Sequence, residues 1–118
     1  MAWHNRLGKH GEWLAAKWLL ARGYELLQQN WRSGRNEIDI IASKGAVLHF
    51  IEVKTRSSSV FGEPEESVNA RKIKRMLAAG DAWLQQQQQW QRVQYDIISI
   101  VIAGNKPPEY FFIEDIYL

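Results

Sequence analysis

The chain of 118 residues contains no cysteine, which excludes disulfide bridges, thiolate-bound zinc and cysteine nucleophiles. No apolar run approaches the ~20 residues that a membrane-spanning helix needs. The first ten residues are polar and lack the apolar stretch of a signal peptide. A glycine-rich phosphate loop and a G-x-S-x-G nucleophile elbow are also missing from the sequence. The lack of a membrane span and of a signal peptide predicts a cytoplasmic protein with no membrane partner.

The net charge is small, +2 at neutral pH, with an isoelectric point near 9.0. Such a balance is compatible with nucleic-acid binding without requiring it. The distribution of charge is more informative, because basic residues crowd into segments 54–56 and 71–75. Acidic residues gather at 63–66 and near the C-terminus.

The length predicts one domain over residues 1–118, and 46% of the residues are hydrophobic. Hydrophobic periodicity predicts two helices, the first capped by Asn5 and ended by Gly23. Turn residues and alternating patterns predict five strands. The order α-β-β-β-α-β-β predicts an α/β fold with a mixed β-sheet flanked by helices. The expected elements are helices at 6–22 and 69–89, and strands at 24–31, 37–42, 47–55, 95–103 and 109–113.

Three ionisable residues interrupt two of the expected strands. Asp39, Glu52 and Lys54 are spaced as D-x12-E-x-K between apolar neighbours. A charged side chain is rarely placed in a buried strand unless it is paired or binds a metal. Alternation puts Glu52 and Lys54 on one face of their strand, roughly 6–7 Å apart, and puts Glu37 and Asp39 on one face of the strand before it.

The hairpin between these strands leaves two registers open. A two-residue loop at Lys44-Gly45 sets Glu37 opposite Glu52, whereas a loop at Gly45-Ala46 sets Asp39 opposite Glu52. Both registers place the four side chains on one face, and a slip by one residue would separate them.

Two carboxylates and a lysine at this spacing point to metal-assisted phosphate chemistry. Mg²⁺ (or Mn²⁺) prefers oxygen ligands, which Asp39 and Glu52 supply and to which the Val53 carbonyl could add. Glu12, at the edge of the buried stripe of the first helix, is a candidate outer ligand. A metal polarises a phosphoryl oxygen and lowers the pKa of bound water, and Lys54 can stabilise developing charge or orient that water. The alternative is a structural Glu52–Lys54 ion pair with Asp39 as a solvated edge residue.

The blocks E-I-D-I-I-A at 37–42 and F-I-E-V-K-T-R at 50–56 resemble the PD-(D/E)-x-K nuclease superfamily. The closer resemblance is to the YraN-like uncharacterised protein family 0102, whose members look like small relatives of archaeal Holliday-junction resolvases. It extends from residue 5 to about residue 100. Besides the two blocks it includes Gly11-Glu12, Ala15, Gly23-Tyr24, Asn30, Phe61-Gly62, Pro64, Val68, Lys72 and Tyr95-Asp96.

The resemblance implies a restriction-endonuclease-like core, and thus a single endonuclease-like domain that cleaves DNA with a bound metal. On the family pattern, Glu12, Asp39, Glu52 and Lys54 match the nuclease site. A homodimer is implied by analogy, because junction resolvases need two active sites. The chain departs from the pattern at Asn36, where glycine is usual, and in its C-terminal residues 113–118.

Basic residues near these blocks are candidate contacts to nucleic acid. Cations in the early turns of a helix oppose the helix dipole, and phosphate contact would explain their position. A solvated basic face explains it equally well. The expected contacts are Arg35, Arg56, Arg71, Lys72 and Arg75. Arg35 is a weaker candidate than the others, as is Arg32 on the same turn.

The six tryptophans and three histidines give weaker signals. Trp3, Trp31 and Trp90 could stack on bases, although packing is the more frequent use of tryptophan. The histidines show no metal-ligand spacing, and His49 is expected to be structural.

The sequence thus predicts a metal-dependent endonuclease acting on DNA. Branched, damaged and single-stranded DNA all stay open as substrates, as does RNA. The alternative is a non-catalytic nucleic-acid-binding or adaptor module on the same fold, which would use the basic helix alone.

Overall fold

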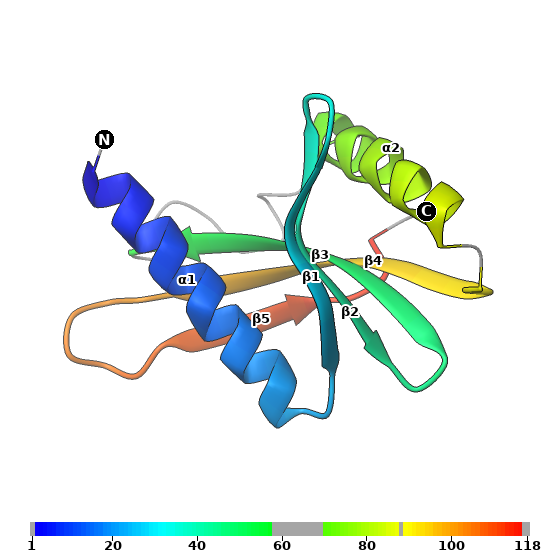
Figure 1. The fold of residues 1–118 in the computed structure, drawn as a ribbon. Coiled ribbons are helices and arrows are strands. Elements are labelled where there is room, and N and C mark those ends of the chain that lie inside the picture. Colours follow the sequence, from blue (N-terminus) through cyan, green and yellow to red (C-terminus); the bar gives the residue numbers. More distant parts are fainter. Residues whose placement is uncertain (1, 58–69, 88, 117–118) are drawn as a thin grey trace.

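The computed structural model describes residues 2–57, 70–87 and 89–116, and only the backbone of residues 2–5. The predicted order α-β-β-β-α-β-β is confirmed (Figure 1). The acidic segment 63–66 and the family-pattern residues Phe61-Gly62, Pro64 and Val68 lie outside the described residues. The elements are α1 (Ala2–Ala21), β1 (Glu25–Ser33), β2 (Asn36–Lys44), β3 (Val47–Arg56), α2 (Ala70–Gln86), β4 (Arg92–Val101) and β5 (Glu109–Ile113).

The strands form one mixed sheet in the order β1-β2-β3-β4-β5. β3 and β4 run parallel, and the other neighbouring pairs are antiparallel. This mixed α/β arrangement is consistent with a restriction-endonuclease-like core. Neither α1 nor α2 is long and apolar enough to cross a membrane.

The two helices cover opposite faces of the sheet. Phe50 and Ile51 are neighbours on β3 and therefore point to opposite sides. Ile51 packs with Ala15 and Leu19 of α1, whereas Phe50 packs with residues of α2. The core thus has two halves, one under each helix, with β3 buried between them.

The first helix begins earlier than predicted. It starts at Ala2, so the helical Asn5 cannot be its cap, because a capping residue has non-helical dihedral angles. No helix-breaking residue stands between Ala2 and Asn5, so the helix continues through the expected boundary. The predicted end is confirmed: Gly23 has φ 88°, and its N–H donates to the Leu20 carbonyl at 3.1 Å.

Two glycines let the helices approach the sheet closely. A Cβ built on Gly11 of α1 would overlap the Thr55 side chain of β3, and one on Gly80 of α2 would overlap the ring of Tyr95 on β4. Gly11 therefore sets α1 directly on the end of β3 and brings the adjacent Glu12 to that end.

The buried face of α2 consists of Met76, Ala79, Gly80 and Trp83. Ile73, Leu77 and Leu84 are only partly buried. Contact between Gly80 and the Tyr95 ring fixes which side of α2 meets the sheet. That contact turns Ala79 and Trp83 inward.

Candidate nuclease site

The hairpin between β2 and β3 has the register that sets Asp39 opposite Glu52. Lys44 pairs with Val47, so the loop is Gly45-Ala46, with Gly45 at φ 61°. This is the second of the two predicted registers. Continued past the last regular pair, Ile40 with Ile51, it brings Asp39 to Glu52.

The two strands separate at Asp39. Figure 1 shows the start of β2 rising toward α2, whereas the end of β3 runs out toward α1. Ile38 belongs to the core cluster under α2 and Ile40 to the cluster under α1. The strict alternation that we expected through Asp39 therefore fails. Asn30, opposite this point on β1, has φ 53°, a local irregularity that accompanies the turn of the strand.

The Asp39 carboxylate fills the gap where the strands part. Its Oδ2 accepts a hydrogen bond of 2.8 Å from the backbone N–H of Val53 on β3. Asp39 is therefore partly buried and held in place rather than being a solvated edge residue, as the structural alternative required.

Like charges surround Asp39. Burial is the main reason that the pKa of its carboxyl rises to about 7; the negative charges of Glu12, Glu52 and Glu37 add to the rise, and the Val53 hydrogen bond opposes it. The charge of Glu12 on α1 thus acts on Asp39 of β2, and the place of Glu12 in a nuclease site, which the family pattern implies, stays a prediction. Such a cluster favours either a proton or a cation.

Glu52 and Lys54 lie on one face of β3, as predicted. The Lys54 Nζ is 3.7 Å from Glu52 Oε1. Burial raises the pKa of Glu52, and the charge of Lys54 lowers it in part. The second oxygen, Oε2, is buried and has no hydrogen-bond partner in the part of the chain that the structure describes.

This donor set fits a hard divalent cation. Asp39 and Glu52 offer carboxylate oxygens, the Lys54 ammonium group lies beside Glu52, and Glu52 Oε2 is buried without a partner among the described residues. A cation would remove the mutual repulsion that contributes to the raised pKa of Asp39.

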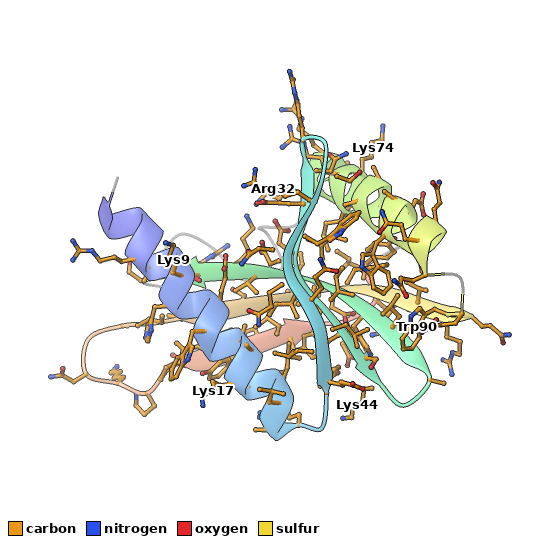
Figure 2. The ribbon with its side chains drawn as sticks, viewed as in Figure 1. Lys9, Lys17, Arg32, Lys44, Lys74 and Trp90 are labelled. Carbon is orange, nitrogen blue, oxygen red and sulfur yellow. The ribbon has the colours of Figure 1, made fainter. Side chains whose placement is uncertain are left out.

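A cavity of about 260 Å³ opens beside Glu52 on the α2 side of the sheet. The predicted contacts Arg35, Lys72 and Arg75 line it, as does Arg32, whose Nε lies 3.1 Å from Glu37 Oε2. Figure 2 shows Arg32 near the rising end of the β1–β2 hairpin. The other two predicted contacts lie apart from this wall: Arg71 is exposed on α2, and Arg56 ends β3.

A second cluster lies at the opposite end of β3 and β4. Ligand atoms of His49, Asp96 and Glu114 lie within 4.8 Å of one another, a spacing compatible with a metal ion. His49 Nδ1 and Asp96 Oδ2 are 2.6 Å apart and buried, and Asp96 Oδ1 accepts hydrogen bonds from Gln94 Nε2 and the N–H of Asp115. These bonds tie the C-terminal segment to β4 and agree with a structural role for His49. Sequence spacing could not reveal the cluster, because its members come from separate elements.

Two of the three tryptophans that were considered for base stacking take the more frequent role, packing. Trp31 and Trp90 are partly buried and pack against the core under α2. The side chain of Trp3 lies outside the described residues. Trp13, which the sequence analysis did not single out, is 54% exposed.

Fold and site together define an α/β protein with a carboxylate–lysine cluster where two strands of a mixed sheet part. The chain belongs to the Uncharacterised protein family UPF0102, whose model matches residues 11–100. A UPF0102 protein of Phocaeicola vulgatus is 44% identical over 116 residues, which cover 98% of this chain and 93% of that protein. One from Rhodococcus opacus is 38% identical over 118 residues, covering 99% and 100%. One from Chlorobaculum parvum is 49% identical over 100 residues, covering 84% and 77%.

These relatives carry the name of the family and no activity. The fold and the carboxylate cluster are consistent with the PD-(D/E)-x-K nuclease superfamily.

Proposed function

We propose that this protein is a metal-dependent endonuclease that hydrolyses phosphodiester bonds of DNA, including branched or junction DNA. The observation that supports this most is the position of the Asp39 carboxylate. It is held by Val53 where β2 and β3 part, beside Glu52 and within electrostatic reach of Glu12. A cytoplasmic location and DNA as partner belong to the same proposal.

Asp39 and Glu52 would hold the cation, with Glu12 as a third ligand, and Mg²⁺ or Mn²⁺ suits these oxygens. A cation so bound supplies a polarised phosphoryl oxygen and a water of lowered pKa. The hydrogen bond from Val53 engages Oδ2 of Asp39, so that Oδ1 would be the oxygen to bind the cation.

Lys54 carries the positive charge on the protein side of the reaction. Its ammonium nitrogen lies 3.7 Å from Glu52 Oε1, which is longer than a hydrogen bond. The ammonium group can therefore exchange this contact for one with a phosphate oxygen. Contact with charge that develops on the phosphate would stabilise the transition state more than the ground state. Arg35, Lys72 and Arg75 would bind neighbouring phosphates from the wall of the 260 Å³ cavity.

The experiment that tests the proposal is a cleavage assay on branched, linear and single-stranded DNA with Mg²⁺ or Mn²⁺. Asp39→Asn and Lys54→Ala should each abolish cleavage while the circular dichroism spectrum is unchanged. Glu109→Gln and Lys106→Ala, at exposed positions, are the matched controls and should cleave like the wild type. Cleavage that persists in Asp39→Asn would overturn the proposal.

DNA binding separates the enzyme from the adaptor alternative. In the enzyme, Asp39→Asn should bind DNA as well as the wild type or more tightly, because a repelling anion is lost. Arg75→Ala should weaken binding and reduce the slope of log affinity against log salt by about 1. DNA binding without cleavage under any metal condition would favour the adaptor. Sedimentation with and without junction DNA tests the homodimer that a resolvase would form.

A further inference from the structure

The outward face of α1 is a continuous stripe of exposed side chains. Its members recur at helical spacing, three or four residues apart. Trp13 and Leu20 are 54% and 52% exposed, high values for apolar side chains of this size. The stripe consists of Arg6, Lys9, His10, Trp13, Lys17 and Leu20.

The charges of this stripe have one sign. Glu12 is the only acidic residue of α1, and its charge acts on Asp39 at the carboxylate cluster. Arg6, Lys9 and Lys17 therefore present three cations with no acid among them. Figure 2 shows Lys9 and Lys17 projecting from the helix. A surface of this kind attracts a polyanion.

The indole of Trp13 is fixed by its neighbours although it faces solvent. The His10 ring lies nearly parallel to it, with centroids 6.1 Å apart and an interplanar angle of 13°. The Lys17 Nζ lies 5.3 Å from the ring centroid. An exposed aromatic ring beside a lysine is suited to stack on a nucleic-acid base while the cations of the stripe meet the phosphates.

We infer that the outer face of α1 binds unpaired nucleotides, with Trp13 stacking on a base and Arg6, Lys9 and Lys17 contacting the adjoining phosphates. A base must be unstacked to offer its face, so the ligand contains a single-stranded segment. Trp13 directly follows Glu12 in α1, about 100° further round the helix, so a strand that crosses α1 would reach from Trp13 toward the carboxylate cluster. The inference rests on the proposed function and deepens it: the substrate would carry unpaired nucleotides beside the bond that is cut.

Binding measured without metal tests this inference independently of cleavage. Fluorescence anisotropy would follow a labelled oligothymidylate and a blunt duplex of equal length. Trp13→Ala should weaken single-strand binding roughly 5- to 150-fold and leave duplex binding within about two-fold. Lys17→Ala should weaken both and lower the salt slope by about 1. Leu27→Ala, which removes an exposed apolar side chain on β1, and Lys106→Ala should bind like the wild type.

The results separate this inference from the proposed function. Unchanged single-strand affinity in Trp13→Ala overturns the inference, even if the wild type cleaves DNA. Single-strand binding that depends on Trp13 would support the inference even if the protein cleaves no DNA. In that case the proposed nuclease activity would be contradicted. Self-association of the wild type that Trp13→Ala abolishes, with DNA affinity unaffected, would assign the face to a second copy instead.

Discussion

The Asp39 carboxylate takes the place of a strand partner for Val53. Its Oδ2 accepts the Val53 N–H at 2.8 Å, at the point where β2 no longer pairs with β3. One side chain therefore both closes the end of the ladder and supplies a charge to the cluster. The site depends on the parting of two strands, which a regular sheet would not offer.

Asp39→Asn should stabilise the protein against urea, and more so at pH 8 than at pH 5. Burial and the charges of nearby carboxylates raise the pKa of Asp39 from 3.8 to about 7, so the folded state keeps a proton that the unfolded state loses. The contribution to stability is full below pH 3.8 and is lost as the pH rises through about 7. Asparagine avoids this loss and can still accept the Val53 hydrogen bond. The gain at pH 8 should be on the order of 1–3 kcal/mol.

Urea unfolding of both proteins across pH 5–8 measures the difference. Glu109→Gln, at an exposed position, should show none. Equal curves for Asp39→Asn and wild type at pH 8 would contradict the raised pKa of Asp39.

Divalent cations should raise the melting temperature at pH 8 by several degrees. A ligand that binds the folded state alone stabilises it, and the effect should fade below pH 7 because protons compete for Asp39. Asp39→Asn and Glu52→Gln should each remove the response to Ca²⁺ or Mn²⁺ in a thermal melt. Asp96→Asn distinguishes the second cluster: if it alone removes the response, the cation binds at His49, Asp96 and Glu114 instead.

Gly11→Ala should destabilise the fold by about 1–3 kcal/mol, because the new methyl group would overlap the Thr55 side chain and push α1 from β3. The same displacement should withdraw Glu12 and reduce cation affinity. Gly8→Ala is the matched control. Among the described residues, nothing beyond the neighbouring residues and backbone of α1 itself lies within 4 Å of the new methyl group, so this change should be neutral or stabilising by up to ~1 kcal/mol. The double variant Gly11→Ala with Thr55→Ala should recover part of the loss in chemical denaturation.

Asp96→Ala should cost about 2–4 kcal/mol of unfolding free energy. The change leaves His49 and the Asp115 N–H without the Asp96 carboxylate, removes one of the two acceptors of the Gln94 amide, and empties a fully buried position. Asp81→Ala, on the exposed side of α2, serves as the control and should change stability by less than about 0.5 kcal/mol. A loss similar to that of Asp81→Ala would mean that the C-terminal segment needs no such anchor.

Local signals in the sequence were sufficient to predict the helices and strands. They also predicted the half of the site that lies on β3. Gly23 ends α1 as its position predicted, and the Gly45-Ala46 loop gives one of the two registers that were left open. Alternation placed Glu52 and Lys54 together, because that rule holds along the regular strand β3.

The other features of the fold and site depend on tertiary contacts, which local sequence patterns do not reveal. β2 parts from β3 because its residues pack against two helices on opposite faces of the sheet. The hydrogen bond to Asp39 depends on this separation. Sequence patterns also failed for Trp13, since an exposed ring and a core ring look alike in a helical repeat. The His49–Asp96 pair spans 47 residues, and only the parallel pairing of β3 with β4 brings it together.

β1 forms one edge of the sheet, where a foreign strand could add itself. The shift of register between Leu26 and Gln28, and the left-handed Asn30, interrupt the regular row of backbone donors and acceptors that such an addition would need. The same distortion that accompanies the opening of the sheet should therefore protect the protein from growing into fibrils.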